Sequence, residues 1–133
     1  MIRPEFLVPN KQRTQETDIS KLEDKDLLIL LGGIKELAQI RGFKSVGYSI
    51  PSATPIYVMA ACTIAWVGNY ETNNEDIIFE ALADASPDNT QSFAKNYLAA
   101  IAENRAFVRC VRNFLKINIV GQDEVGEIGR AHV

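Results

Sequence analysis

The chain has 133 residues, of which 47% are hydrophobic and 23% charged, and its formal net charge at pH 7 is −3. These values are typical of one globular domain with its own core, and the acidic balance argues mildly against a nucleic-acid-binding protein. No apolar run reaches the roughly 18 residues of a membrane helix and no charged-then-apolar leader is visible, so we predict neither a membrane span nor a signal peptide. Cys62 and Cys110 lie in apolar contexts, which indicates buried free thiols in a reducing compartment.

The first segment, residues 1–19, is polar and irregular and contains Pro4 and Pro9. We expect it to form an N-terminal arm, in which the apolar patch Phe6–Val8 is able to add an edge strand. A single core domain is expected over residues 20–120, because no internal repeat or low-complexity tract interrupts it.

A helical pattern opens this core domain. Ser20 and Glu23 have the spacing of a capping box, and apolar residues recur with a helical period from Leu27 to Ile40. Gly42 is expected to close the helix as its C-cap. The pair Gly32–Gly33 costs about 1 kcal/mol per glycine relative to alanine, which favours either a kink or a close helix contact at this point.

The pattern then changes to period two, which is typical of strands. A short strand around Val46–Ile50 is expected to end at Pro51, and a longer strand follows over Ile56–Val67. Asn69–Asn74 supplies turn residues, and Asp76–Ala83 predicts a third strand that pairs antiparallel with the second.

One long helix is expected over Gln91–Ile117, which contains no Pro or Gly and is rich in Ala, Leu and Arg. Asn89 or Thr90 is the expected N-cap, and Ile117–Val120 is consistent with a fourth short strand. The order helix, three strands, helix predicts an α+β domain with its helices on one face of an antiparallel β-meander.

Three arginines share one side of this expected helix. At about 100° per residue, Arg109 lies about 40° and Arg112 about −20° from Arg105. The opposite side carries apolar residues: Phe107, Cys110, Val111 and Phe114. Like charges at i and i+4 destabilise a helix by about 0.2–0.5 kcal/mol, so we expect these guanidiniums to bind anions elsewhere. The anions are either carboxylates on a neighbouring strand or external phosphate groups.

The charges are unevenly distributed along the chain. No Lys or Arg lies between Lys44 and Lys95, whereas five basic residues and only one acidic residue lie within 91–117. The hairpin region is acidic through Glu71, Glu75, Asp76, Glu80, Asp84 and Asp88. Such a chain can present a basic face although it is acidic overall.

Catalytic motifs are largely absent from the sequence. It contains no GxSxG, no Walker-type glycine loop and no metal-spaced Cys/His cluster, so we expect no enzyme, no cofactor and no bound metal. One alternative is a metal-dependent nuclease that holds a divalent ion through Glu75, Asp76, Glu80 and Asp84. Acidic residues at alternating strand positions are more often a solvated face.

The order of elements and the run at Ala102–Leu115, AENRAFVRCVRNFL, resemble the single-strand annealing proteins of the Rad-fifty-two superfamily, particularly its phage-type recombination proteins. Those proteins typically carry A-E-x-R-A-x-x-R-A-L-R-x-x-L in the helix after the meander. The resemblance extends from about Leu22 to Ile119.

This resemblance implies a protein that forms rings or filaments, binds single-stranded DNA in a positively charged groove and anneals complementary strands without nucleotide hydrolysis. It also implies a role in recombination and repair inside the cell, in the host cytoplasm if a phage encodes the chain. By motif position Arg109 and Arg112 would contact backbone phosphates, and Arg105 matches an arginine usual in phage members. Lys44 and Lys95 would add contacts. The acidic hairpin departs from the family pattern, in which more basic residues are expected.

The alternative to DNA binding is an α+β interaction or assembly module. In that interpretation the arginines pair with Glu80 and Asp84 across the sheet, and no nucleic acid is bound.

The last seven residues, Glu127–Val133, read EIGRAHV and match the in-frame translation of a common short-read sequencing adapter. We therefore expect a non-native tail, so that His132, the only histidine, carries no chemistry. Residues 121–126 would then be the start of a truncated C-terminal region.

Overall fold

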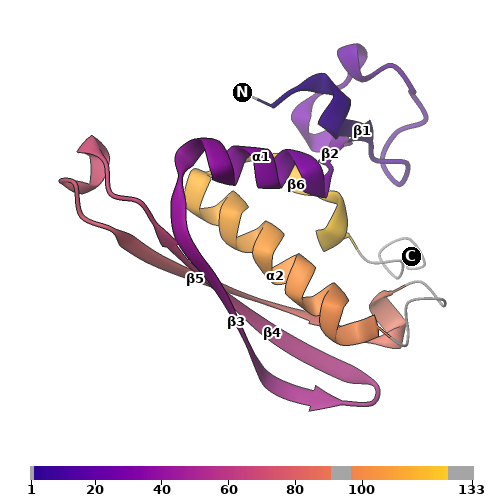
Figure 1. Cartoon of the computed structure of the whole chain (residues 1–133). Coiled ribbons are helices and arrows are strands. Elements are labelled where there is room, and N and C mark those ends of the chain that lie inside the picture. The colour runs from indigo at the N-terminus through magenta and orange to yellow at the C-terminus, as the bar shows by residue number, and fades with distance from the viewer. Residues whose placement is uncertain (1, 91–96, 126–133) are drawn as a thin grey trace.

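Two helices and two three-stranded sheets make up the part of the chain that the structure, a computed structural model, describes: residues 2–90 and 97–125. The helices are α1 (Leu31–Arg41) and α2 (Leu98–Leu115). The predicted α+β class, with an antiparallel meander followed by a long helix, is confirmed (Figure 1).

The meander consists of β3 (Phe43–Thr54), β4 (Tyr57–Trp66) and β5 (Ile77–Ala85), which pair antiparallel in that order. The expectation that the first strand ends at Pro51 is wrong. β3 continues to Thr54, with an irregularity in its pairing between Ser49 and Ser52. Proline is tolerated here because β3 is an edge strand, where one side of the backbone needs no partner in the sheet.

Helix α2 packs on one face of the meander, and α1 packs on α2 (Figure 1). The side chains that β4 turns toward α2 are buried, as are those on the facing side of α2, and together they form one core. Members of this core with no exposed surface include Ile34, Cys62, Ile64, Trp66, Val108, Cys110 and Val111. Both cysteines are free thiols. Neither helix is long and apolar enough to cross a membrane, among the residues described.

The second sheet is small and joins distant parts of the chain. Its central strand β2 (Leu27–Ile29) pairs antiparallel with β1 (Leu7–Pro9) and parallel with β6 (Val120–Gly121). The expected short strand after α2 therefore lies at Val120–Gly121 and belongs to this sheet. In this sheet β1, from the expected N-terminal arm (residues 1–19), pairs with β2, from the expected core domain (residues 20–120).

The expectation that a helix starts near Ser20 is wrong. Ser20 lies in a 3₁₀ turn, Ile19–Lys21, whose cap is Asp18, and Glu23 precedes a second turn at Asp24–Asp26. Leu27–Ile29 is buried on both sides as a central strand, and in so short an apolar run periodicity does not distinguish a strand from a helix.

Gly32 and Gly33 lie in the first turn of α1, beneath the ring of Phe6. A Cβ added at Gly33 would approach the Phe6 Cβ to 2.7 Å, and one added at Gly32 would approach the ring to 3.0 Å. Of the two alternatives that the sequence left open, the structure favours a close contact, and the contacting residue ends the short 3₁₀ helix Pro4–Phe6 before β1.

An aromatic cluster closes the end of the core where both helices terminate. The rings of Trp66 and Phe114 stack with centroids 4.4 Å apart, and Phe43 and Phe79 approach this pair edge-on. The Arg41 guanidinium lies over the Phe114 ring at 5.4 Å and donates a hydrogen bond to the Val67 carbonyl at 2.7 Å. Arg41 thus extends the aromatic stack toward the surface.

Candidate functional site

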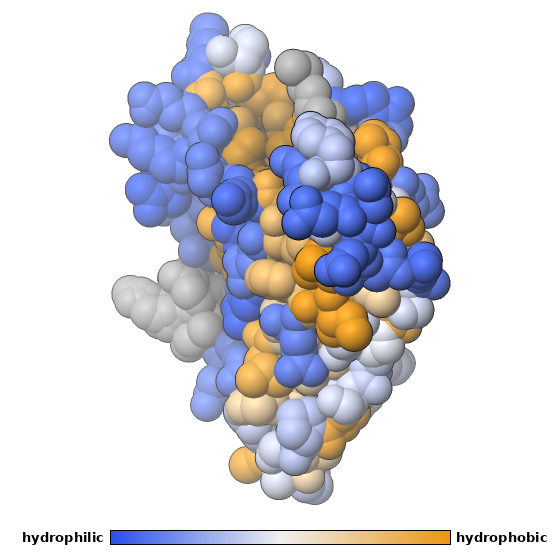
Figure 2. All heavy atoms as spheres, turned by 90° about the vertical axis from the view of Figure 1, so that its left-hand side faces the viewer, coloured by the Kyte–Doolittle hydropathy of each residue, from blue (hydrophilic) through white to orange (hydrophobic). Residues whose placement is uncertain are grey.

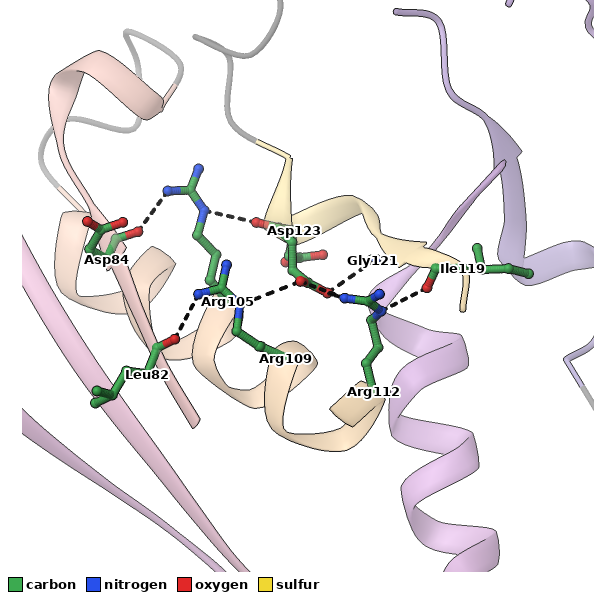
Figure 3. Close-up of polar contacts among 9 residues, drawn as sticks. Leu82, Asp84, Arg105, Arg109, Arg112, Ile119, Gly121 and Asp123 are labelled. Carbon is green, nitrogen blue, oxygen red and sulfur yellow. Dashed lines mark hydrogen bonds and ion pairs between the residues drawn. The ribbon is translucent and has the colours of Figure 1, made fainter. Parts of the chain in front are cut away.

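Arg105 lies inside the protein, with 7% of its surface exposed (Figure 3). Its Nε donates to the Asp123 carbonyl at 2.9 Å, and its Nη1 donates to the Asp84 carbonyl at 3.0 Å and to Asn89 Oδ1 at 2.8 Å. Its Nη2 donates to the Asn89 carbonyl. Burial lowers the pKa of Arg105, an effect opposed by the nearby Asp84 and Asp123 carboxylates. Of the two kinds of partner expected for the arginines, an external phosphate group is therefore wrong for Arg105, whose acceptors lie inside the protein.

The turn that follows β5 holds Arg105 in place. Asn89, expected as a helix cap, accepts from the Ser86 amide at 2.8 Å and from Arg105. Thr90, the other expected cap, is buried and donates to the Ser86 carbonyl at 2.9 Å. Neither residue caps α2, because the residue before that helix is Tyr97 and forms no side-chain cap. Residues 91–96 of the expected helix lie outside the described residues.

Arg109 and Arg112 share a single carboxylate, that of Glu124. Both carboxylate oxygens of Glu124 lie 2.8 Å from Arg112 Nη1. One of them, Oε2, also lies 3.6 Å from Arg109 Nε. Arg112 also donates from Nε to the Ile119 carbonyl at 2.9 Å. The Arg112 side chain is 16% exposed and that of Arg109 is 40% exposed, so this pair reaches the surface mainly through Arg109.

Carbonyl groups of β5, rather than carboxylates, are the sheet partners of the arginines. Arg109 Nη1 donates to the Leu82 carbonyl at 2.8 Å, and Arg105 binds that of Asp84. The side chains proposed as partners are bound differently: Glu80 accepts from Thr63 at 2.8 Å, and Asp84 accepts from Asn89 at 3.4 Å. Internal binding, one of the two alternatives that the sequence left open, therefore occurs, but not through the Glu80 and Asp84 carboxylates named for it.

The two lysines expected to add DNA contacts are not joined to this cluster. Lys44 Nζ lies 2.6 Å from Asp76 Oδ2, at the base of the β4–β5 hairpin. That ion pair and the Gly68 amide lower the pKa of Asp76. Lys95 lies outside the described residues, as does the tail Glu127–Val133.

Two residues with site chemistry were missed from the sequence. Glu124 was placed in the start of a truncated region, although a glutamate soon after an arginine-rich helix is a signal for an ion pair. The second is Arg41, which lies in the last turn of α1. In the structure it is partly exposed and forms no ion pair with a described carboxylate, while its guanidinium is fixed over Phe114.

The absence of a side chain at Gly121 allows the segment that follows α2 to pack closely against this helix. A Cβ at this position would overlap Val108 Cγ1, which belongs to a fully buried side chain of the core. We expect Gly121→Ala to destabilise the fold by about 1–3 kcal/mol through overpacking, and the added change Val108→Ala to relieve that overlap. Urea unfolding followed by circular dichroism measures both. Gly47→Ala is the matched control, because a Cβ there meets no atom within 4 Å. Equal effects at Gly121 and Gly47 would refute this packing.

The described parts of the chain contain no group of three or more His, Cys, Asp or Glu side chains that could hold a metal ion.

Comparisons with protein-family models, with curated proteins and with solved structures give no match. What the site offers chemically is a pair of guanidiniums near the surface, held in fixed orientations and balanced by one carboxylate.

Proposed function

We propose that this chain binds single-stranded DNA and promotes annealing of complementary strands, as an oligomer and without nucleotide hydrolysis, in recombination and repair. The observation that supports the proposal is the position of the arginine run on α2. The meander precedes α2 in the order that the resemblance implies. Arg109 lies between α2 and β5, and Arg112 lies between α2 and the segment that follows it.

Annealing requires that the DNA backbone is held while the bases remain exposed. Contacts from guanidiniums to phosphate satisfy this requirement, because they position a strand without reading its sequence. Each phosphate neutralised on a single strand adds about 0.7 to the slope of log affinity against log salt concentration. One subunit with few such contacts binds weakly, and an oligomer accumulates them.

In this proposal the expected contact residues have two different roles. Arg105 is a structural residue in this proposal, because its donors are bound inside the protein. Arg109 and Arg112 remain the phosphate contacts, with Lys44 and Lys95 as expected additions. Arg41 joins them, since its stacked guanidinium is partly exposed and free of carboxylate partners among the described residues.

We expect salt-sensitive binding of a fluorescent oligothymidylate, measured by anisotropy at several salt concentrations alongside light scattering of the protein. Arg109→Gln should lower the salt slope by about 0.7 and weaken binding at low salt. Lys21→Gln is the matched control, because Lys21 is exposed, lies in the distant 3₁₀ turn at Ile19–Lys21 and forms none of the ion pairs of the described residues. A folded protein that binds no oligonucleotide at low salt would refute the proposal, as would equal losses in the two variants.

A second function, that of an interaction module, is favoured by the outer face of the meander. β4 and β5 contain no Lys or Arg, and Ile78 and Leu82 on that face are 72% and 47% exposed. Figure 2 shows apolar and polar side chains interspersed on the side of the molecule that it draws. Oligomers that form without any DNA binding in the assay above would support this function instead.

A further inference from the structure

The Glu124 carboxylate is buried although it lies beside a surface arginine. Its side chain is 8% exposed, and both of its oxygens are bound to Arg112, with Arg109 Nε 3.6 Å away. One oxygen also accepts from the Gly121 amide at 3.3 Å. Glu124 belongs to the 3₁₀ turn Gln122–Glu124, which directly follows β6 and packs on α2.

This carboxylate has the charge and the shape of a phosphate group that the same arginines would bind. Carboxylate and phosphodiester each carry one negative charge and present two oxygens to a guanidinium fork. Two arginines that share one carboxylate retain a net positive charge, which attracts a second anion. Arg109, the more exposed of the two, is the point at which that anion would first arrive.

We infer that Glu124 is an internal occupant of the phosphate site formed by Arg109 and Arg112, and that a DNA backbone phosphate displaces the turn Gln122–Glu124 when it binds. This inference rests on the proposed function. In this inference the turn is an autoinhibitory contact: Glu124 occupies the two guanidiniums until a DNA strand competes for them.

The anchoring of the turn is compatible with local displacement. The turn follows a two-residue strand and spans three residues, so few backbone hydrogen bonds must break for it to open. Gly121 can remain seated on Val108 as the pivot. Opening breaks the ion pairs of Glu124, the hydrogen bond that Glu124 accepts from Gly121, and the bond from Arg105 Nε to the Asp123 carbonyl.

The decisive variant is Glu124→Gln, which removes the charge while its amide oxygen can still accept from Gly121. Binding of a fluorescent oligothymidylate should become about three- to tenfold tighter at low salt. The salt slope should stay close to that of the wild type, because displacement of the turn leaves the same arginine–phosphate contacts in both complexes. Asp123→Asn is the matched control: it removes one negative charge from the adjacent residue, whose carboxylate forms none of the ion pairs of the described residues. Burial raises the pKa of Asp123, so the comparison is made at pH 8.

The outcomes separate this inference from the function on which it rests. A gain in affinity for Glu124→Gln alone supports it, also where the wild type binds only weakly. Wild-type binding with an unchanged affinity in Glu124→Gln, or with equal gains in Asp123→Asn, overturns the inference and leaves the proposed function standing. Absence of binding in both folded proteins overturns the proposed function.

A measurement on the unaltered protein gives an independent test. The Gly121 amide is hydrogen-bonded to the Glu124 carboxylate, whereas the bond from the Val125 amide to the Gln122 carbonyl lies within the turn itself. Hydrogen exchange of the Gly121 amide should become faster when oligothymidylate is added, because displacement of the turn breaks its bond to Glu124. Unchanged or slower exchange at saturating DNA overturns the inference.

Discussion

Arg105→Ala is expected to lower the free energy of unfolding by about 3–5 kcal/mol, the size typical of removing one partner from a buried charged network. The guanidinium fastens three segments to α2: the end of β5, the turn at Pro87–Asn89 and the turn at Gln122–Glu124. Without it, the carbonyls of Asp84, Asn89 and Asp123 lose a buried donor, and each unsatisfied group costs about 1–3 kcal/mol.

Urea unfolding followed by far-ultraviolet circular dichroism measures this loss, and the melting temperature should fall by more than about 10 °C. Arg109→Ala is the matched control on the same helix face, because its side chain is 40% exposed and donates one hydrogen bond to the sheet. We expect Arg109→Ala to cost about 1 kcal/mol or less. Two variants of equal stability would refute the structural role of Arg105.

Arg105→Lys refines the same test. Lysine keeps the positive charge and loses the planar fork that reaches several acceptors at once. Stability close to that of Arg105→Ala would show that the hydrogen bonds matter here, and stability close to the wild type would show that charge alone suffices.

Trp66→Ala is expected to destabilise the protein by about 3–5 kcal/mol, which is typical of truncating a buried aromatic side chain. Trp66 has no exposed surface, stacks on Phe114 and meets the edge of Phe43, so the cavity opens between β4 and α2. Its Nε1 is the single buried side-chain nitrogen or oxygen without a hydrogen-bond partner among the described residues. Trp66→Phe removes that unpaired donor together with some volume, and we therefore expect a smaller loss than for alanine.

Thermal unfolding followed by circular dichroism is the appropriate measurement for both variants, since each removes the only tryptophan. Tyr70→Ala is the control, because Tyr70 is 85% exposed in the hairpin turn and should change stability by no more than about 0.5 kcal/mol. A loss in Trp66→Ala as small as that of Tyr70→Ala would refute the aromatic core described above.

The meander could be predicted from the sequence because its signals are local. Alternation along Ile56–Val67 and Asp76–Ala83 and the turn residues Asn69–Asn74 lie within one continuous stretch, and β4 and β5 fall within one or two residues of those limits. The strand β2 could not be predicted, because Leu27–Ile29 is buried by partners from opposite ends of the described chain.

The arginines show the same division between local and distant causes. Helical periodicity placed Arg105, Arg109 and Arg112 on one side of α2, and all three do converge on the segment that follows β6. Periodicity could not show that this side is covered, because the cover consists of turns before and after the helix. The interior position of Arg105 is therefore a property of the tertiary fold rather than of the helix.

The small sheet β1-β2-β6 has a consequence for the order in which the protein folds during its synthesis. β2 is made early, whereas its parallel partner β6 leaves the ribosome only after the whole meander and α2. A domain generally folds as a unit, so the packing of α2 on the meander and the pairing of β6 with β2 both wait until this late part of the chain has emerged. Of the described strands β6 is synthesised last, and translational pausing before Val120 would leave Val108 and the arginine face of α2 without this cover.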